Sequence, residues 1–307
     1  MAKRADTSAQ QRVCMNSAKF SNISVRRPEI RVHYVSKTRP KITSHRQRII
    51  LYVILISAIL LVSIAFTTNY EKSHNNLVPG NQQVRTGLIV PLYFDPNGLW
   101  GELISIHKQY PNVPIVAIIN PENGSGNNVS KSYLYWTQMM ESSGIVVLGY
   151  IFTSYGMRSP DVIEQQAMNY SIWYKVNGIF LDEVSDNSSA SQFYHTVVSS
   201  IRALGLEYIV GNPGTYSPNS ITSCFNLTVL YEDPGLPEAG SFNSIVNGTS
   251  RANSSIISFN VPYLAPSWLE SAKKYFLFIY ITNLGSPDPY DGLPSYILNE
   301  MQMLSLQ

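Results

Sequence analysis

Short apolar runs alternate with longer amphipathic segments from residue 86 to the C-terminus. The runs are continuously apolar, which is typical of parallel strands buried on both faces. Eight strands are predicted, at Gly87–Phe94, Val113–Asn120, Ile145–Ile151, Gly178–Asp182, Glu207–Gly211, Thr228–Glu232, Ile256–Val261 and Tyr275–Thr282. Six helices are predicted between and after them, at residues 99–110, 130–143, 160–175, 190–204, 266–274 and 294–304.

The helices after the fifth and sixth strands are poorly defined by this pattern. Eight strands at regular spacing nevertheless predict an α/β fold of the (β/α)8, or TIM, barrel type. The alternative is an open doubly wound sheet, which seldom reaches eight parallel strands with this spacing.

A longer apolar run precedes this domain. It extends from Ile49 to Phe66, reads IILYVILISAILLVSIAF and contains no charged residue. A helix rising about 1.5 Å per residue is then just long enough to cross the core of a bilayer. We therefore expect a transmembrane helix at residues 49–67 that acts as an uncleaved signal anchor. A cleaved signal peptide is the alternative, but both the preceding segment and the apolar run are longer than is usual for one.

Charge divides the chain at this run. Residues 1–50 carry 12 Lys and Arg against two carboxylates, whereas the other 257 residues carry 10 Lys and Arg against 18 Asp and Glu. A basic segment can indicate nucleic-acid binding, but next to a membrane span it is explained by the positive-inside rule, so no nucleic-acid partner is expected. The N-terminus is predicted to be cytoplasmic, and the barrel is predicted to lie outside the cell membrane.

These features divide the chain into four parts. Residues 1–48 form a basic cytoplasmic tail that is expected to be disordered, and residues 49–67 are expected to form a helix in contact with the lipid bilayer. Residues 68–85 form a polar linker, and residues 86–307 form the barrel. Seven Asn-x-Ser/Thr sequons in the barrel fit an exported domain, although an Asn- and Ser-rich sequence also produces them by chance. Cys14 and Cys224 lie on opposite sides of the span, so no disulfide is expected between them. No Cys/His cluster has zinc spacing, and neither a metal nor a cofactor is expected.

Carboxylates follow two of the predicted strands directly. The fourth strand ends in Asp182 and Glu183, and the sixth ends in Glu232. Because the carboxyl ends of barrel strands meet at one rim, these acids are expected to face each other across its mouth. Two opposed carboxylates are what glycoside hydrolysis requires, one as nucleophile or base and the other as acid. The structural alternative is that they cap the following helices or pair with Arg158.

Polar and aromatic residues at the other strand ends are candidates for substrate binding. Aromatic rings pack on sugar faces, while hydroxyl, amide and charged groups orient sugar hydroxyls. The candidates are Tyr93, Asn120, Tyr150, Tyr155, Arg158, Asn212 and Tyr231. The glycine-containing loop at residues 123–128 lacks both the dinucleotide fingerprint and Gly-Lys-Ser/Thr, and no Gly-x-Ser-x-Gly elbow indicates a serine hydrolase.

The strand-end segments together resemble the spherulin-4 family. They read GLIVPLY, VPIVAIINPENGSG, GIVVLGYIFTSYGMR, YKVNGIFLDEVS, EYIVGNPGT and VLYED in that order, and residues 288–296 are similar to the family's ending. The family includes fungal glycoside hydrolases that cut polysaccharide containing N-acetylgalactosamine. The resemblance covers about residues 87–296 and implies a (β/α)8 barrel. Its essential acids would be Asp182, Glu183 and Glu232.

Two departures from the family lie at the same rim. Relatives often have a His within the segment that reads Ser258-Phe259-Asn260 here, and an Asp is common where Thr282-Asn283 stands. Because these positions line the mouth, they bear on the identity of the substrate more than on the type of reaction.

The sequence therefore predicts an outward-facing, membrane-anchored endo-glycosidase that cleaves an N-acetylgalactosamine-type polysaccharide with retention of configuration. Asp182 is predicted to be the nucleophile and Glu232 the general acid/base, with Glu183 orienting the sugar or tuning the pKa values of its neighbours. The main alternative is a non-catalytic carbohydrate-binding barrel at the cell surface. A third hypothesis is a scaffold whose partner binds the basic tail.

Overall fold

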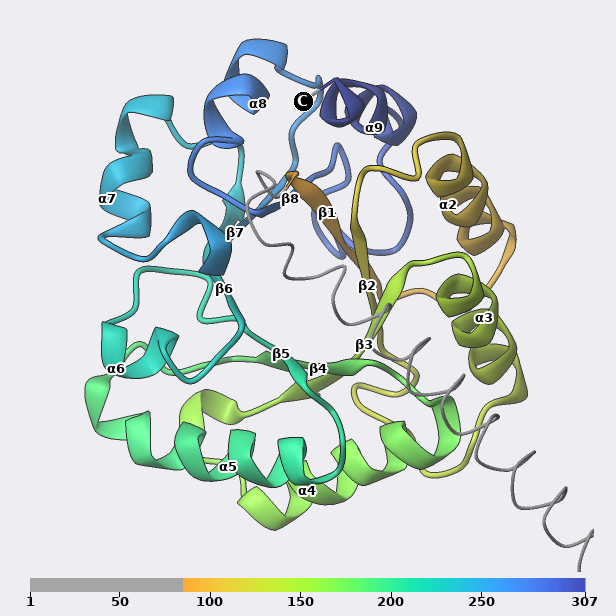
Figure 1. Ribbon diagram of the computed structural model, residues 1–307, viewed down its shortest axis with the longest axis vertical. Coiled ribbons are helices and arrows are strands. Elements are labelled where there is room, and N and C mark those ends of the chain that lie inside the picture. Colours follow the sequence, from red (N-terminus) through yellow and green to blue (C-terminus); the bar gives the residue numbers. More distant parts are fainter. Residues whose placement is uncertain (1–84, 307) are drawn as a thin grey trace, which may run out of the picture. The chain divides into compact units, whose positions relative to one another are not determined.

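Eight parallel strands close into a barrel in the computed structural model, which describes residues 85–306 (Figure 1). The strands pair in chain order, and β8 closes the barrel on β1 through the pair Leu88 and Ile279. They are β1 Gly87–Leu92, β2 Ile115–Ile119, β3 Val146–Phe152, β4 Gly178–Asp182, β5 Tyr208–Gly211, β6 Leu227–Pro234, β7 Ser254–Phe259 and β8 Phe278–Ile281. The predicted eight-stranded parallel barrel is confirmed.

Six longer helices surround the strands (Figure 1). They are α2 Gly98–Gln109, α3 Lys131–Ser142, α4 Pro160–Asn169, α5 Ser191–Ala203, α8 Pro266–Ala272 and α9 Ile297–Ser305, and each coincides with a predicted helix. One π-helical turn, Tyr170–Tyr174, extends α4. After β5 and β6 the chain forms only the short helices α6 Asn219–Thr222 and α7 Phe242–Val246. Single 3-10 turns lie at Ser154–Gly156, Ser188–Ala190, Ala239–Ser241 and Arg251–Asn253.

Close packing inside the barrel fixes the start of the strand that carries the first candidate acid. Gly178 begins β4, and a β carbon there would lie 1.8 Å from the carbonyl oxygen of Tyr208. Only glycine permits this approach of the two strands. The resulting register pairs Phe152 with Asp182, so Asp182 lies at the carboxyl end of β4.

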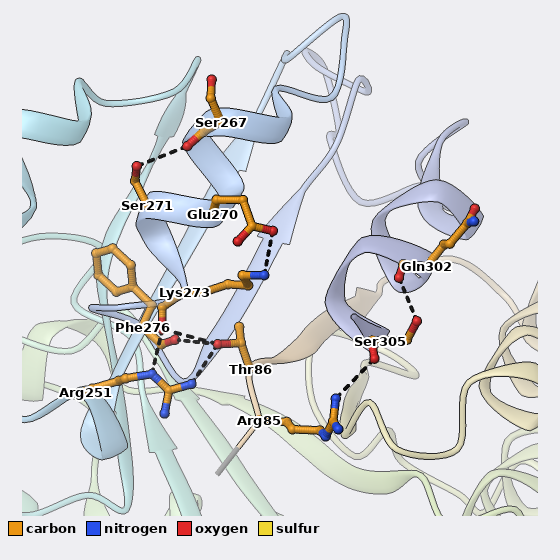
Figure 2. Close-up of polar contacts among 10 residues, drawn as sticks. All are labelled: Arg85, Thr86, Arg251, Ser267, Glu270, Ser271, Lys273, Phe276, Gln302 and Ser305. Carbon is orange, nitrogen blue, oxygen red and sulfur yellow. Dashed lines mark hydrogen bonds and ion pairs between the residues drawn. The ribbon is translucent and has the colours of Figure 1, made fainter. Parts of the chain in front are cut away.

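The chain enters the barrel at the amino ends of the strands, where several polar contacts hold it (Figure 2). Arg85 donates from Nη1 to the carbonyl oxygen of Ser305 at 3.1 Å. Arg251 donates from Nη2 to Oγ1 of Thr86 at 2.7 Å and from Nε to the carbonyl oxygen of Lys273 at 2.6 Å. These bonds tie the start of β1 to the end of α9 and to the segments before β7 and β8. The candidate site residues lie at the opposite, carboxyl ends of the strands.

The predicted tail and transmembrane helix, at residues 1–48 and 49–67, lie outside the described residues, as does the predicted linker apart from Arg85. Between residues 85 and 306, no helix combines the length and the apolar character needed to cross a bilayer. Anchoring in a membrane therefore stays a prediction.

Glu300 in α9 gives a testable pH dependence of stability. Its side chain is fully buried, and neither carboxylate oxygen has a hydrogen-bond partner among residues 85–306. Burial raises the pKa of Glu300 well above its ordinary value. Below that ordinary value both the folded and the unfolded chain hold the proton. At higher pH the unfolded chain releases it first, so stability falls as pH rises toward the folded pKa.

Replacing Glu300 with Gln is therefore expected to raise the melting temperature near pH 8 and to change it less near pH 5. The gain at pH 8 should be about 2–4 °C, the shift that 1 kcal/mol produces in a domain of this size. Thermal unfolding of the full-length protein at both pH values measures it. Glu102→Gln, at an exposed position of α2, is the matched control and should show no such pH dependence. An equal shift at the two pH values would contradict the assignment.

Candidate active site

Two carboxylates at the carboxyl ends of the strands are joined by one side chain. Asn212, directly after β5, donates from Nδ2 to Oδ1 of Asp182 at 2.8 Å and to Oε2 of Glu232 at 2.5 Å. An amide nitrogen carries two hydrogens, so each carboxylate receives one. The amide oxygen of Asn212 is buried and has no partner among the described residues. The two carboxylates therefore determine how this amide is oriented.

Tyrosines hold the other oxygen of each carboxylate. Tyr150 of β3 donates its hydroxyl to Oδ2 of Asp182 at 2.8 Å, and Tyr290, in the segment after β8, donates to Oε1 of Glu232. The ring of Tyr93, which follows β1, packs edge-on against both, with centroid distances of 5.2 Å to Tyr150 and 5.4 Å to Tyr290. Three tyrosines from distant parts of the chain thus form one wall beside the carboxylate pair.

A bulge in β6 positions Glu232. The pairing of β6 with β7 shifts register between Val229 and Glu232, and such irregularities often re-aim a side chain next to an active site. The backbone N–H of Glu232 then donates to the carbonyl oxygen of Gly214 at 3.0 Å. Gly214 has φ +64°, and a β carbon there would lie 3.5 Å from Cβ of Glu232. The loop that carries Asn212 therefore packs directly against the second carboxylate.

Glu183 lies beside the pair in a left-handed backbone conformation, with φ +50°. This conformation costs a non-glycine residue roughly 1 kcal/mol or more. Two hydrogen bonds to its carbonyl oxygen stabilise the turn, one from Oγ1 of Thr153 and one from the backbone N–H of Tyr155, both at 2.7 Å. The Glu183 carboxylate is half-buried and makes no hydrogen bond to the described residues. Burial lowers the pKa of Arg158 and raises that of Tyr150; the charge of Glu183 opposes the first shift and adds to the second, so Glu183 lies within electrostatic reach of both.

The two central carboxyls differ in what shifts their pKa. Burial raises the pKa of Asp182, while hydrogen bonds from Tyr150, the Glu183 backbone N–H and Asn212 oppose that rise. Burial also raises the pKa of Glu232, and the charge of Asp182 adds to the rise, while bonds from Tyr290 and Asn212 oppose it. When the pair holds a single proton, these causes favour the proton on Glu232 and the negative charge on Asp182. One group can attack, and the other can supply a proton.

The structure brings three of the predicted binding residues, Tyr93, Tyr150 and Asn212, together with Asp182 and Glu232. The other four are placed differently. Tyr155 is exposed on the loop after β3, and Asn120 accepts from the backbone N–H of Gly124 at 2.8 Å and so holds its own loop. Tyr231 is half-buried against the hydrophobic core, and among residues 85–306 no hydrogen bond joins Tyr231 or Asn120 to either acid.

Arg158 donates to the carbonyl oxygen of Phe152 at 2.9 Å, and its guanidinium carbon lies 3.8 Å from the centroid of the Phe152 ring. The salt bridge found in the described part of the chain joins Lys273 and Glu270 instead. The turn at Ser188–Ala190 is capped by Asn187 rather than by Asp182 or Glu183. Neither structural alternative for the strand-end acids, helix capping or pairing with Arg158, is found between residues 85 and 306.

Tyr290, which contacts Glu232, was not among the site residues expected from the sequence. It lies in the C-terminal stretch that resembles the family's ending, and that resemblance was the signal that could have identified it. A hydrogen bond from its backbone N–H to Oδ1 of Asp288 at 2.9 Å forms the local turn. Thr282 and Asn283, one of the two departures from the family pattern, hold the same loop, because Thr282 Oγ1 accepts from Leu284 N–H and Asn283 Oδ1 accepts from Ser295 N–H. In residues 85–306, no group of three or more His, Cys, Asp or Glu side chains is arranged to hold a metal ion.

Comparison with known proteins identifies similar sequences and folds. The profile of the Spherulation-specific family 4 matches residues 87–304, more than half of the chain. Spherulin-4 of Physarum polycephalum is 32% identical over 151 residues, and this match spans 48% of the chain and 45% of the length of Spherulin-4. The crystal structure of Aspergillus clavatus Sph3 in complex with GalNAc aligns with a TM-score of 0.67 and 23% identity, covering 73% of this chain and 98% of Sph3. At that identity the likeness to Sph3 shows the fold.

Proposed function

The chain belongs to the Spherulation-specific family 4, and from this premise we propose that its barrel is a glycoside hydrolase. The observation that carries the proposal is the pair Asp182 and Glu232, which Asn212 joins at the carboxyl ends of the strands. Both residues are only half-buried, at the open carboxyl ends of the strands. Opposed carboxyls with different protonation states are the machinery of glycoside hydrolysis.

In the proposed reaction, protonated Glu232 gives its proton to the glycosidic oxygen while the Asp182 carboxylate attacks the anomeric carbon. The bond from that carbon to the leaving oxygen breaks, and a glycosyl ester forms on Asp182. The negative charge of Asp182 is one cause of the raised pKa of Glu232, after burial. Because esterification removes that charge, it lowers the pKa of Glu232 and favours the carboxylate form needed for the next step. The Glu232 carboxylate then accepts a proton from the attacking water, and hydrolysis of the ester restores both groups. Glu183, beside them, would bind a sugar hydroxyl.

The bridging amide supports retention of configuration. The bonded oxygens of Asp182 and Glu232 cannot lie farther apart than the two hydrogen bonds laid end to end, 2.8 Å and 2.5 Å. Retaining enzymes hold their carboxyls about 5–5.5 Å apart, whereas inverting enzymes need roughly 6.5–9.5 Å to admit a water. Proton NMR of a digest should therefore show the substrate's own anomer as the first product. Initial release of the opposite anomer would indicate inversion.

Charge at the mouth bears on the substrate. The eight loops that follow the strands contain one cation and seven carboxylates, namely Arg158 and Asp95, Glu122, Glu183, Asp186, Glu238, Asp288 and Asp291. Such a rim repels a polyanion and accepts a neutral or cationic chain. Together with the family and the GalNAc complex of Sph3, this favours an amino-sugar polysaccharide of the N-acetylgalactosamine type, cleaved internally. The test is release of reducing ends by the full-length protein from a linear, partly N-acetylated galactosamine polymer.

We further propose that residues 49–67 anchor the chain in the cell membrane, with residues 1–48 in the cytoplasm and the barrel outside. The support is the charge step across the apolar run, 12 Lys and Arg against two carboxylates in residues 1–50. Cys14 would then be cytoplasmic and Cys224 external.

A membrane-impermeant thiol reagent should therefore label Cys14 only after intact cells are permeabilised. Cys224 is a buried free cysteine, so it should stay largely unlabelled in the folded protein on either side of the membrane. A Cys224→Ser variant limits the signal to Cys14. Labelling of Cys14 in intact cells would contradict the proposed orientation.

A further inference from the structure

Exposed aromatic side chains gather on the loops around the proposed active site. Residues 85–306 contain four, Tyr135, Tyr155, Tyr216 and Tyr263, with exposed fractions of 56%, 60%, 48% and 81%. Tyr135 lies on the outer helix α3, whereas the other three lie on loops that follow strands. Exposing an aromatic ring to water is unfavourable relative to covering it with a partner, so this placement calls for an explanation.

The three loop tyrosines alternate with the candidate acids around the mouth. The strands follow one another in chain order around the closed barrel. Tyr155 follows β3, Tyr216 follows β5 and Tyr263 follows β7, while Asp182 ends β4 and Glu232 lies in β6. Each acid-bearing strand is therefore flanked by two loops that expose a tyrosine, and together they form one arc of the mouth.

Backbone hydrogen bonds fix these loops to the segments that carry the acids. Tyr155 donates its N–H to the carbonyl oxygen of Glu183 at 2.7 Å, in a left-handed conformation with φ +57°. Gly214, two residues before Tyr216, accepts from the N–H of Glu232 at 3.0 Å. Phe259, at the end of the strand that leads to Tyr263, accepts with its carbonyl oxygen from the N–H of Gly235, just after β6, at 2.8 Å. The position of each loop is thus set relative to the reacting groups.

We propose that Tyr155, Tyr216 and Tyr263 form outer sugar-binding subsites, on which the polysaccharide units to either side of the cleaved bond pack. This inference rests on the proposed function and adds where the polymer lies. A protein partner would need a contiguous apolar patch, but here single rings are separated by strand ends that carry carboxylates. A sugar chain, with apolar faces between hydroxyl groups, matches that alternation of rings and polar groups.

The experiment compares long and short substrates in the full-length protein with Tyr216→Ala and Tyr263→Ala combined. Each ring contact is worth roughly a threefold change in affinity or more. KM for a linear, partly N-acetylated galactosamine polymer is therefore expected to rise about tenfold, with kcat retained. Cleavage of an aryl N-acetylgalactosaminide, which does not reach the outer loops, should stay within twofold. Tyr155 is left unchanged because its backbone supports Glu183.

Tyr135→Ala is the matched control, since it removes an equally exposed ring from the outer surface, and it should change neither substrate. An unchanged polymer KM in the double variant, or an equal loss on both substrates, would overturn the inference. If the wild-type protein releases no reducing ends, the proposed function fails, and affinity electrophoresis in the same polymer still tests the subsites. Retardation lost in the double variant and kept in Tyr135→Ala would support them, whereas equal retardation would refute them.

Discussion

Asp182→Asn and Glu232→Gln are each expected to lower turnover of an amino-sugar polymer by several orders of magnitude. Each substitution nearly preserves volume and removes the charge or proton that the two-carboxylate reaction requires. Because both groups act in the same chemical steps, combining the substitutions should add little to either one alone. Reducing-end release by the full-length protein measures the effect.

Thermal unfolding separates lost chemistry from lost folding. Burial raises the pKa values of both carboxyls, so ionisation of these groups costs folding free energy. The neutral amides are therefore expected to keep or raise the melting temperature while activity disappears. Glu183→Gln, whose carboxylate makes no hydrogen bond within residues 85–306, should cost less activity than either. Hydrolysis that persists in a folded Asp182→Asn, Glu232→Gln double variant would rule out the site assignment.

A non-catalytic carbohydrate-binding barrel would give the opposite result. The wild-type protein would then bind the polymer without releasing reducing ends, and the two substitutions would leave affinity nearly unchanged. Loss of affinity would follow instead from truncating rings at the mouth, such as Tyr93. The amide that joins Asp182 to Glu232 favours the enzyme, because holding two half-buried carboxyls this close is unfavourable unless their coupling is used.

The barrel could be predicted because its strands are buried on both faces and so read as uninterrupted apolar runs. Their ends were less accurate. Val113 and residues 275–277 were predicted to belong to strands because they are apolar, but they lie outside β2 and β8. Val113, Phe276 and Leu277 are buried against the core from turns, so their apolar character reflects burial and not strand structure. Helices α6 and α7, with four and five residues, are too short for a helical period to show.

A site residue could be located from the sequence where its place at the end of a strand alone determines its position. Asp182 and Glu232 come directly after the apolar residues of their strands, and the sequence pattern places them at one rim. Asn212 was expected to bind substrate, but its bridging of the two acids depends on the β6 bulge, which no periodicity reveals. Tyr231 was expected to bind substrate, but it packs against the core, because neighbouring residues of a strand point to opposite faces.

Tyr290 could not be assigned from its sequence surroundings. It lies 58 residues from its partner Glu232, in a loop without any periodic pattern. Its place is set by ring contacts with Tyr93, Phe259 and Tyr280, which come from β1, β7 and β8 or the turns after them. Contacts of this kind depend on closure of the barrel, which brings the last strand beside the first.

Tyr150→Phe and Tyr290→Phe form a matched pair that should separate the two carboxyls in a pH–rate profile. Each substitution removes one hydroxyl and keeps the ring. The Tyr150 hydroxyl lowers the pKa of Asp182, and the Tyr290 hydroxyl lowers that of Glu232, because each donates a hydrogen bond to the carboxylate. Removing either hydroxyl therefore raises the pKa of its own partner.

In the proposed reaction kcat/KM requires Asp182 ionised and Glu232 protonated, so Asp182 sets the acidic limb of the profile and Glu232 the alkaline limb. Tyr150→Phe should move mainly the acidic limb to higher pH and narrow the active range. Tyr290→Phe should move mainly the alkaline limb to higher pH and widen it. Each should lower kcat/KM at the optimum by about tenfold, as expected for losing a hydrogen bond to a carboxylate that is charged in the ground state (Asp182) or becomes charged as it gives up its proton (Glu232). Rates measured from pH 3 to pH 9 on one polymer test this, with Tyr135→Phe on the outer surface as the control. A reversed pattern, with Tyr290→Phe moving the acidic limb, would exchange the roles of nucleophile and acid, and unchanged limbs in both variants would contradict the mechanism.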